Sequence, residues 1–217
     1  LMVFFLIPPF FLWNKISPLV FVAICCLLTL LNMQIEKSKI ILFFSLIFFY
    51  LFVAYKDNTN FNGILSLFGI CTLALNSDSF IKDVFKKYVW IYSITLIPSI
   101  ISFLLVNTGV LKLPFSYIEA LNPLKSYNYI HYPFFVQENK ISEIVLPRFH
   151  AYYDEPGVVG TISGIILFVN RFNLKEKINI PIFIAGVLSF SFAFYVIMVI
   201  YVLLFLKMKY KNITSII

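Results

Sequence analysis

The chain has 217 residues, a length that usually indicates one or two globular domains. Its composition argues against a soluble domain, because 61% of the residues are hydrophobic and only 12% are charged, whereas about a quarter of an ordinary soluble domain is charged. The net charge of +7 does not indicate nucleic-acid binding, since no basic domain carries it. We therefore expect an integral membrane protein, and the apolar residues near both ends predict a fragment of a longer one.

Apolar runs separated by short charged loops follow one another along the chain. About 20 apolar residues cross a bilayer as a helix, and these runs are continuous rather than alternating, as barrel strands would be. The runs assigned to spans or part-spans are 1–13, 17–33, 40–55, 63–75, 89–106, 157–169 and 180–206. The predicted fold class is thus all-α, a polytopic transmembrane helical bundle of roughly seven or eight spans or part-spans with one long extracytoplasmic loop.

The last run, 180–206, is long for one crossing and short for two. We favour a tight hairpin that turns near 189–191, with a single tilted helix as the alternative. With the hairpin, the lysines and arginines of alternate loops share one side, which their bias assigns to the cytoplasm. The net charge of +7 then lies on that side, and the outer loops are neutral overall. On the cytoplasmic face, 78–88 predicts a short interfacial helix.

One long polar segment, 107–155, contains both histidines of the chain and several tyrosines. Loops longer than about 15 residues are usually functional or disordered, and the aromatic content favours packing over disorder. Aromatic side chains at the lipid headgroups are the alternative explanation. We therefore predict N-terminal transmembrane helices (1–106), an extracytoplasmic loop with the candidate active site (107–156) and C-terminal transmembrane helices (157–217).

The densest polar cluster, 147–157, lies directly before a predicted span. Residues 154–156 are typical of a helix start, because Asp caps, Pro fits the first turn and acidic side chains oppose the helix dipole. That explanation does not account for Arg148 and His150. Beside two carboxylates, this pair could clamp a diphosphate and provide a general base. An ion pair between Arg148 and one of the carboxylates at the headgroups is the open alternative.

Other small residues indicate packing rather than chemistry. Gly160 and Gly164, in GxxxG spacing, predict close helix packing. Cys25, Cys26 and Cys71 lie inside apolar runs, where lone thiols behave as small hydrophobic residues. The sequence contains no Asp-x-Asp motif and no Cys or His spacing typical of metal ligands, so we expect neither a metal nor a cofactor.

At 148–157 the sequence resembles the O-antigen polymerase family (Wzy-like), within the wider group of polysaccharide polymerases and O-antigen ligases. The resemblance rests on an Arg, then an aromatic residue, then Glu-Pro-Gly opening a membrane helix with further glycines. The large outer loop before it and Leu-Ser-Phe-Ser at 188–191 support the match, which covers about 89–206 in layout. Two departures are Ala151, where the family often has Gly, and Phe after each serine of the later turn, where ligase-like members commonly carry Arg.

The resemblance implies a membrane glycosyltransferase that polymerises lipid-linked oligosaccharide repeat units into a surface polysaccharide, either O-antigen or capsule. The implied place is the outer face of the bacterial plasma (inner) membrane, in a multi-pass protein. The donor is a glycan on undecaprenyl diphosphate, the acceptor is the sugar end of a lipid-linked repeat unit, and lipid diphosphate leaves. The resemblance also leaves room for a chain-length regulator protein as a partner.

Within this scheme, Arg148 is the predicted diphosphate contact, and His150 or Glu155 accepts the proton of the acceptor hydroxyl. The remaining candidates for substrate contact are Lys112, Lys125, His131, Lys140, Tyr152, Tyr153 and Asp154.

Three alternatives stay open: an O-antigen ligase, a carrier or flippase for lipid-linked oligosaccharide, and a noncatalytic scaffold. The absence of Arg at the later turn disfavours the ligase. Ion-coupled carriers place ionisable residues inside their spans, whereas every Asp, Glu, Lys and Arg here lies in a predicted loop or at a span edge. A noncatalytic scaffold would not explain why the polar residues of 148–155 lie together. The polymerase is therefore the favoured prediction.

Overall fold

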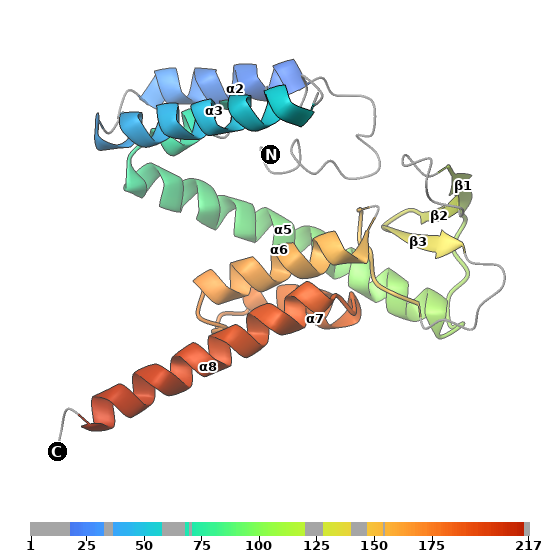
Figure 1. Cartoon of the computed structure of the whole chain (residues 1–217). Coiled ribbons are helices and arrows are strands. Elements are labelled where there is room, and N and C mark those ends of the chain that lie inside the picture. Colours follow the sequence, from blue (N-terminus) through green and yellow to red (C-terminus); the bar gives the residue numbers. More distant parts are fainter. Residues whose placement is uncertain are drawn as a thin grey trace. The chain divides into compact units, whose positions relative to one another are not determined.

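The computed structural model describes residues 18–32, 37–57, 68–69, 71–119, 128–139, 147–153 and 155–214. The helices and strands, labelled in Figure 1, are α2 (Pro18–Asn32), α3 (Lys37–Asp57), α5 (Asp78–Asn107), β1 (Ser116–Ile118), β2 (Asn128–Tyr132), β3 (Phe135–Asn139), α6 (Pro156–Val169), α7 (Asn179–Leu188) and α8 (Phe192–Thr214). The chain divides into two compact units, Leu1–Tyr88 and Val89–Ile217. The three-part division predicted from the sequence, with boundaries at 106 and 156, stays a prediction.

The predicted all-α bundle of seven or eight spans is wrong. Among the described residues, α5 is the one helix that is long and apolar enough to cross a membrane, and a three-stranded antiparallel sheet accompanies the helices. A single such helix is weak evidence for a membrane protein, because a core helix of a soluble protein can have the same length and composition. The shorter apolar helices are Val22–Leu31, Pro156–Val169, Asn179–Leu188 and Phe192–Phe205.

One physical reason is that the long apolar run 180–206 does not form one long helix, because a turn at 189–191 divides it into α7 and α8. The ten residues of α7 extend only about 15 Å, against a bilayer hydrocarbon core of about 30 Å. The predicted run 1–13 and part of 63–75 lie outside the described residues. The cytoplasmic and outer sides assigned to the charged loops depend on the bundle, so they stay a prediction.

In the first unit, a buried polar network joins α2 and α3 to the segment before α5. The hydroxyl of Thr29 donates to the carbonyl of Thr72 (3.1 Å), and the amide of the buried Asn76 donates to the Thr29 hydroxyl (3.0 Å). The ammonium of Lys39 donates to the carbonyl of Asn76 (2.9 Å) and to the carboxylate of Asp78 (2.6 Å). The bonds between Thr29, Thr72 and Asn76 satisfy the hydroxyl of Thr29 and the side-chain N–H of Asn76, which burial would otherwise leave costly.

Helix α5 continues unbroken from Asp78 to Asn107. The separate interfacial helix predicted at 78–88 is therefore wrong, because those residues are the beginning of α5 and no turn separates them from its apolar part. The remainder of α5 carries large apolar side chains with exposed fractions between 42% and 59%. Their spacing of three and four residues places them on one stripe of the helix: Trp90, Ile94, Ile97, Ile101 and Leu104.

Besides the greater part of α5, the second unit contains helices α6, α7 and α8, and α6 packs against both α7 and α8 (Figure 1). A Cβ at Gly160 would lie 2.2 Å from the Cβ of Ser191, and a Cβ at Gly164 would lie 2.9 Å from Cδ1 of Ile197. At Gly160 only glycine leaves room, whereas at Gly164 the end of the Ile197 side chain would have to shift, so the close packing predicted from the GxxxG spacing is confirmed.

The apolar run 180–206 is divided by a turn at 189–191, where Phe190 has a left-handed φ of 47°. The single tilted helix is therefore wrong, and the break lies where it was predicted. Gly186 lets the ring of Phe194 approach α7 closely, since a Cβ there would lie 2.2 Å from that ring. The hydroxyl of Tyr195 donates to the carbonyl of Val187 (3.1 Å) and holds the two sides of the turn together.

The sheet lies within the segment predicted as a long loop, and its order is β1-β2-β3. In the β2–β3 register Tyr132 faces Phe135, so the turn between these strands consists of Pro133 and Phe134. Tyr129, Phe135 and Val136 are fully buried. These aromatic and apolar side chains of the sheet therefore pack in the core, whereas Phe115, Tyr117 and Phe134 are exposed.

The C-terminal half of α5 holds this sheet through three residues spaced four apart. The hydroxyl of Ser99 donates to the carbonyl of Phe134. The ring of Phe103 meets the ring of Phe135 edge-on, with centroids 5.7 Å apart. The side-chain amides of Asn107 and Gln137 lie within hydrogen-bonding distance, at 3.3 and 3.4 Å. The spacing puts Ser99, Phe103 and Asn107 on one face of the helix, so a single helix face positions the sheet.

Candidate functional site

Residues 147–153, the first part of the polar cluster, connect the sheet with the turn between α7 and α8. On the sheet side, the backbone N–H of Val136 donates to the carbonyl of Ala151 (2.8 Å). On the helix side, the N–H of Phe149 donates to the carbonyl of Leu188 (3.0 Å). Ala151 has a left-handed φ of 48°, a conformation that glycine adopts more readily. Backbone bonds at Phe149 and Ala151 thus tie the segment to the helices and to the sheet.

The side chain of Phe149 anchors the same segment in the core. It is fully buried, and its ring meets that of Phe103 edge-on with centroids 5.2 Å apart. Because Phe103 also contacts Phe135, the rings link the connecting segment, α5 and β3. This packing determines where the residues on either side of Phe149 point.

Arg148 closes the C-terminal end of α7. Its Nε donates to the carbonyl of Ser189 (3.3 Å) and its Nη2 to the carbonyl of Phe190 (3.2 Å). Carbonyls at a helix C-terminus carry partial negative charge, so a cation is favourable there. The guanidinium has five N–H donors, so N–H groups remain that could donate to an anion. The ion pair predicted between Arg148 and a carboxylate stays a prediction.

His150 is only 1% exposed and lies against residues of β2 and β3. Its Nε2 is 3.7 Å from the Oε1 of Glu138, and the edge of the Tyr129 ring lies against it at a centroid distance of 6.2 Å. Sequence reasoning did not select Glu138. The strand pairing of Glu138 with Tyr129 brings it to His150, and the alternation within β3 is the one sequence signal that could have indicated this. Burial favours a role for His150 in holding the segment over direct contact with substrate.

Glu155 is exposed and occupies the N-cap position of α6, with extended backbone (φ −134°, ψ 133°) and Pro156 following it. The position of the helix start predicted at 154–156 and the place of Pro156 in the first turn are confirmed, but the N-cap residue is Glu155, without a side-chain capping bond, and Asp154 lies outside the described residues. An exposed carboxylate is better placed than the buried His150 to accept a proton from an entering hydroxyl. Glu155 is therefore the stronger candidate for the general base.

The other predicted site residues are spread over the second unit. Tyr152 is half-buried, and burial raises the pKa of its phenol, while Tyr153 belongs to the core. Lys112 is exposed before β1. Lys125 and Lys140 lie outside the described residues. The structure thus brings Arg148 to the α7–α8 turn and His150 to Glu138, and it gives Tyr153 no exposed face for a sugar.

His131 lies on β2, where its Nδ1 is 3.3 Å from the hydroxyl of Ser116 on β1. Partial burial lowers the pKa of this imidazole below its ordinary value of 6.5. The folded sheet therefore favours the neutral ring. Its contribution to stability is present above pH 6.5 and is lost as the pH falls through the lowered pKa.

We accordingly expect NMR titration of histidine-labelled protein to show one signal with a midpoint below 6.5. The variant His131→Gln identifies that signal by its disappearance. A midpoint at or above the ordinary value would contradict the burial of the ring between β1 and β2. The experiment thus tests the placement of His131 independently of any activity.

Within the described residues, no group of three or more His, Cys, Asp and Glu side chains is arranged to hold a metal ion. The expectation of neither metal nor cofactor stays a prediction. Comparison of the chain with protein-family models, with curated proteins and with solved structures finds no match in any of the three. The family resemblance therefore stays a prediction from the sequence.

Proposed function

We propose that the chain is a glycosyltransferase that extends a surface polysaccharide, using a glycan on a lipid diphosphate such as undecaprenyl diphosphate. The observation that carries the proposal is the position of Arg148. Its guanidinium is held by the carbonyls of Ser189 and Phe190, in the turn between the apolar helices α7 and α8. A planar guanidinium with donors to spare suits the paired oxygens of a diphosphate.

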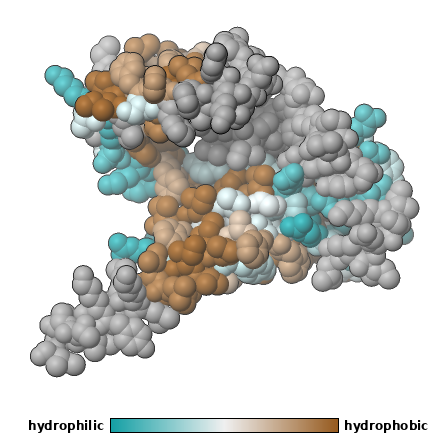
Figure 2. Space-filling model, in the orientation of Figure 1, coloured by the Kyte–Doolittle hydropathy of each residue, from teal (hydrophilic) through white to brown (hydrophobic). Residues whose placement is uncertain are grey.

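Exposed apolar side chains support a membrane location, which for this function is the bacterial plasma membrane. In the second unit they form the stripe on α5 from Trp90 to Leu104 and cover much of α8 between Val199 and Phe205. In Figure 2, hydrophobic residues gather over the helices of this unit and hydrophilic residues lie toward the sheet. Patches of this extent indicate lipid or protein contact. The lipid tail of a substrate would follow the apolar faces and present its diphosphate at Arg148.

The chemistry follows from the same placement. The acceptor hydroxyl attacks the anomeric carbon of the donor glycan, a new carbon–oxygen bond forms, and the bond from that carbon to the phosphate oxygen breaks. Arg148 stabilises the negative charge that develops on the departing lipid diphosphate. Glu155 takes the proton of the attacking hydroxyl. His150, together with Glu138, holds the segment between these two residues.

Replacing Arg148 by alanine in the intact gene is expected to abolish the ladder of glycan lengths and leave single repeat units. The loss of one charge-stabilising donor typically lowers turnover by roughly 100-fold or more. Arg148→Lys keeps the charge without the forked donor geometry, so it should retain short products. A gel of surface glycan, read beside the amount of membrane-inserted protein, measures both effects.

The matched control is Tyr195→Phe, which removes a hydrogen bond to the carbonyl of Val187 at the same end of α7 without changing the charge. We expect this variant to keep its ladder. Equal loss in both variants would assign Arg148 a purely structural role in the turn. An unchanged ladder in Arg148→Ala at normal protein level would contradict the proposal, and loss of all attached glycan would indicate a ligase or a flippase.

A further inference from the structure

The loop between α6 and α7 is held rigid by one buried asparagine. Asn179 is fully buried, and its amide donates to the carbonyl of Asn173 (2.9 Å). Its side-chain oxygen accepts from the amide of Asn170 (2.9 Å). The start and the middle of the loop are therefore tied to the beginning of α7. A connection of this length on a surface needs such bonds to keep one conformation.

Two consecutive residues of this loop have left-handed backbone, Arg171 with φ 54° and Phe172 with φ 47°. Non-glycine residues seldom adopt this conformation, and the surrounding structure must hold them in it. Here α8 does so: the hydroxyl of Tyr201 donates to the carbonyl of Arg171 (2.6 Å), and its ring lies against that of Phe172 with centroids 4.8 Å apart. Backbone strain that neighbouring elements maintain is a reason to look for a function.

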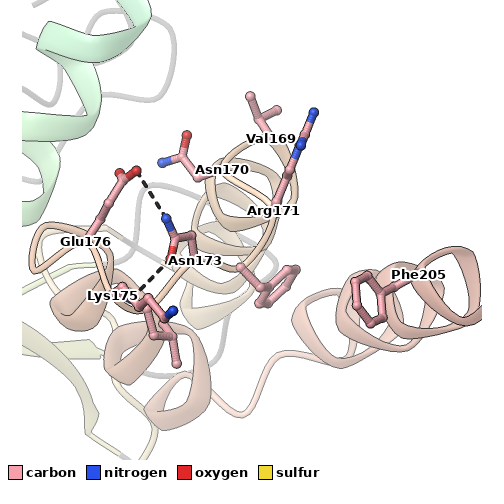
Figure 3. A pocket seen from close by; sticks show the side chains of 9 residues that line it. Val169, Asn170, Arg171, Asn173, Lys175, Glu176 and Phe205 are labelled. Carbon is pink, nitrogen blue, oxygen red and sulfur yellow. Dashed lines mark hydrogen bonds between the residues drawn. The ribbon is translucent and has the colours of Figure 1, made fainter. Parts of the chain in front are cut away.

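An open hollow with a volume of about 1000 Å³ lies between this loop and α8 (Figure 3). Two exposed basic residues, Arg171 and Lys175, line it. Glu176 is the one acidic residue of the lining, and its carboxylate accepts a hydrogen bond from the side-chain amide of Asn173 (3.3 Å). Figure 3 shows Asn173 between Glu176 and Lys175. The lining also includes three exposed apolar side chains, Val169, Leu174 and Phe205.

We propose that this hollow binds the phosphate headgroup of an anionic phospholipid. Arg171 and Lys175 place positive charge on two sides of the hollow, since their side chains leave the loop in different directions (Figure 3), and this charge attracts the phosphate. The exposed apolar residues of the rim supply a surface for the beginning of the acyl chains. A soluble anion would use the two cations but would gain nothing from the apolar rim, so the combination favours a lipid. The lining is positive overall, which matches the charge of the headgroup.

This lipid site is separate from the proposed glycan site. Arg148 precedes the beginning of α6, whereas the hollow follows its end, and the 14 residues of α6 extend about 20 Å. Substitutions in the hollow should therefore leave the glycan chemistry in place. Failure of one proposal does not entail failure of the other.

The test uses native mass spectrometry of the full chain in neutral detergent, titrated with phosphatidylglycerol, with phosphatidylcholine and with inorganic phosphate. We expect one phosphatidylglycerol to be retained per chain. In Arg171→Gln/Lys175→Gln, its affinity should fall about fivefold for each charge removed, or roughly 25-fold for the pair. The matched control Lys86→Gln/Lys87→Gln removes the same charge from exposed positions on α5 and should change the affinity less than about twofold.

Equal weakening in both double variants would overturn the proposal, because the binding would then reflect net charge alone. Equal retention of phosphatidylcholine, or displacement of the lipid by inorganic phosphate at matched concentration, would overturn it as well. Should Arg171→Gln prevent folding, Lys175→Gln alone leaves the left-handed backbone untouched. That single variant is expected to weaken phosphatidylglycerol binding about fivefold, and unchanged affinity would count against the site.

Discussion

Replacing Gly160 by alanine is expected to lower the free energy of unfolding by about 1–3 kcal/mol, the usual cost of overpacking a filled site. The added methyl group would lie 2.2 Å from the Cβ of Ser191 and 2.7 Å from the hydroxyl of Ser189. Helix α6 and the turn between α7 and α8 would have to move apart. For a chain of this size, thermal unfolding should shift down by roughly 2–4 °C for each kcal/mol.

The same helix offers a matched control, because a Cβ at Gly157 would meet no atom within 4 Å. Gly157→Ala should therefore leave the melting temperature unchanged or raise it, since alanine favours helix more than glycine does. Combining Gly160→Ala with Ser191→Gly removes the closest contact and should restore part of the lost stability. A double variant as unstable as Gly160→Ala alone would show that the contact with Ser191 is not the cause.

Features encoded by a few adjacent residues could be predicted from the sequence. The start of α6 follows from an acidic residue before Pro156. The close packing at Gly160 follows from the spacing of small residues. The break at 189–191 follows from an apolar run too long for one crossing. In each case the physical cause is local in sequence: a few adjacent residues, the spacing of two glycines, or the length of one apolar segment.

The sheet could not be predicted in the same way. Strands β2 and β3 have five residues each, and the two-residue turn between them is Pro133-Phe134 rather than the Asn-Gly or Asp-Gly pair that signals a hairpin. The aromatic residues of these strands were also compatible with a headgroup belt. Their burial depends on α5, whose contact residues Ser99 and Phe103 lie about 30 positions earlier in the chain.

The contacts of the candidate site were missed for a related reason. The sequence led us to expect an ion pair between Arg148 and a nearby carboxylate, because charged side chains can be identified from the sequence alone. Its described partners are backbone carbonyls of Ser189 and Phe190, about 40 residues away, and every residue type has such a carbonyl. The meeting of His150 with Glu138 likewise depends on strand register. Local patterns therefore located the cluster but did not identify what each side chain contacts.

The largest loss of stability is expected from Phe149→Ala. The side chain is fully buried, and its removal leaves a cavity against Phe103 where the connecting segment, α5 and β3 meet. Truncation of a buried phenylalanine costs about 3–5 kcal/mol. The loss should also weaken the bond from the Phe149 N–H to the carbonyl of Leu188, and with it the hold of Arg148 on the α7–α8 turn. Thermal unfolding measures the first effect.

Hydrogen exchange measures the second effect, because amides of β3 and of the turn should lose protection together if Phe149 couples them. Phe134→Ala is the matched control, since Phe134 is an exposed residue of the β2–β3 turn and its carbonyl, which accepts from Ser99, remains. An exposed site of this kind usually changes stability by less than about 0.5 kcal/mol. If both variants melt alike, or if only β3 loses protection, Phe149 does not link the sheet to the turn, and Arg148 is held there by its own hydrogen bonds alone.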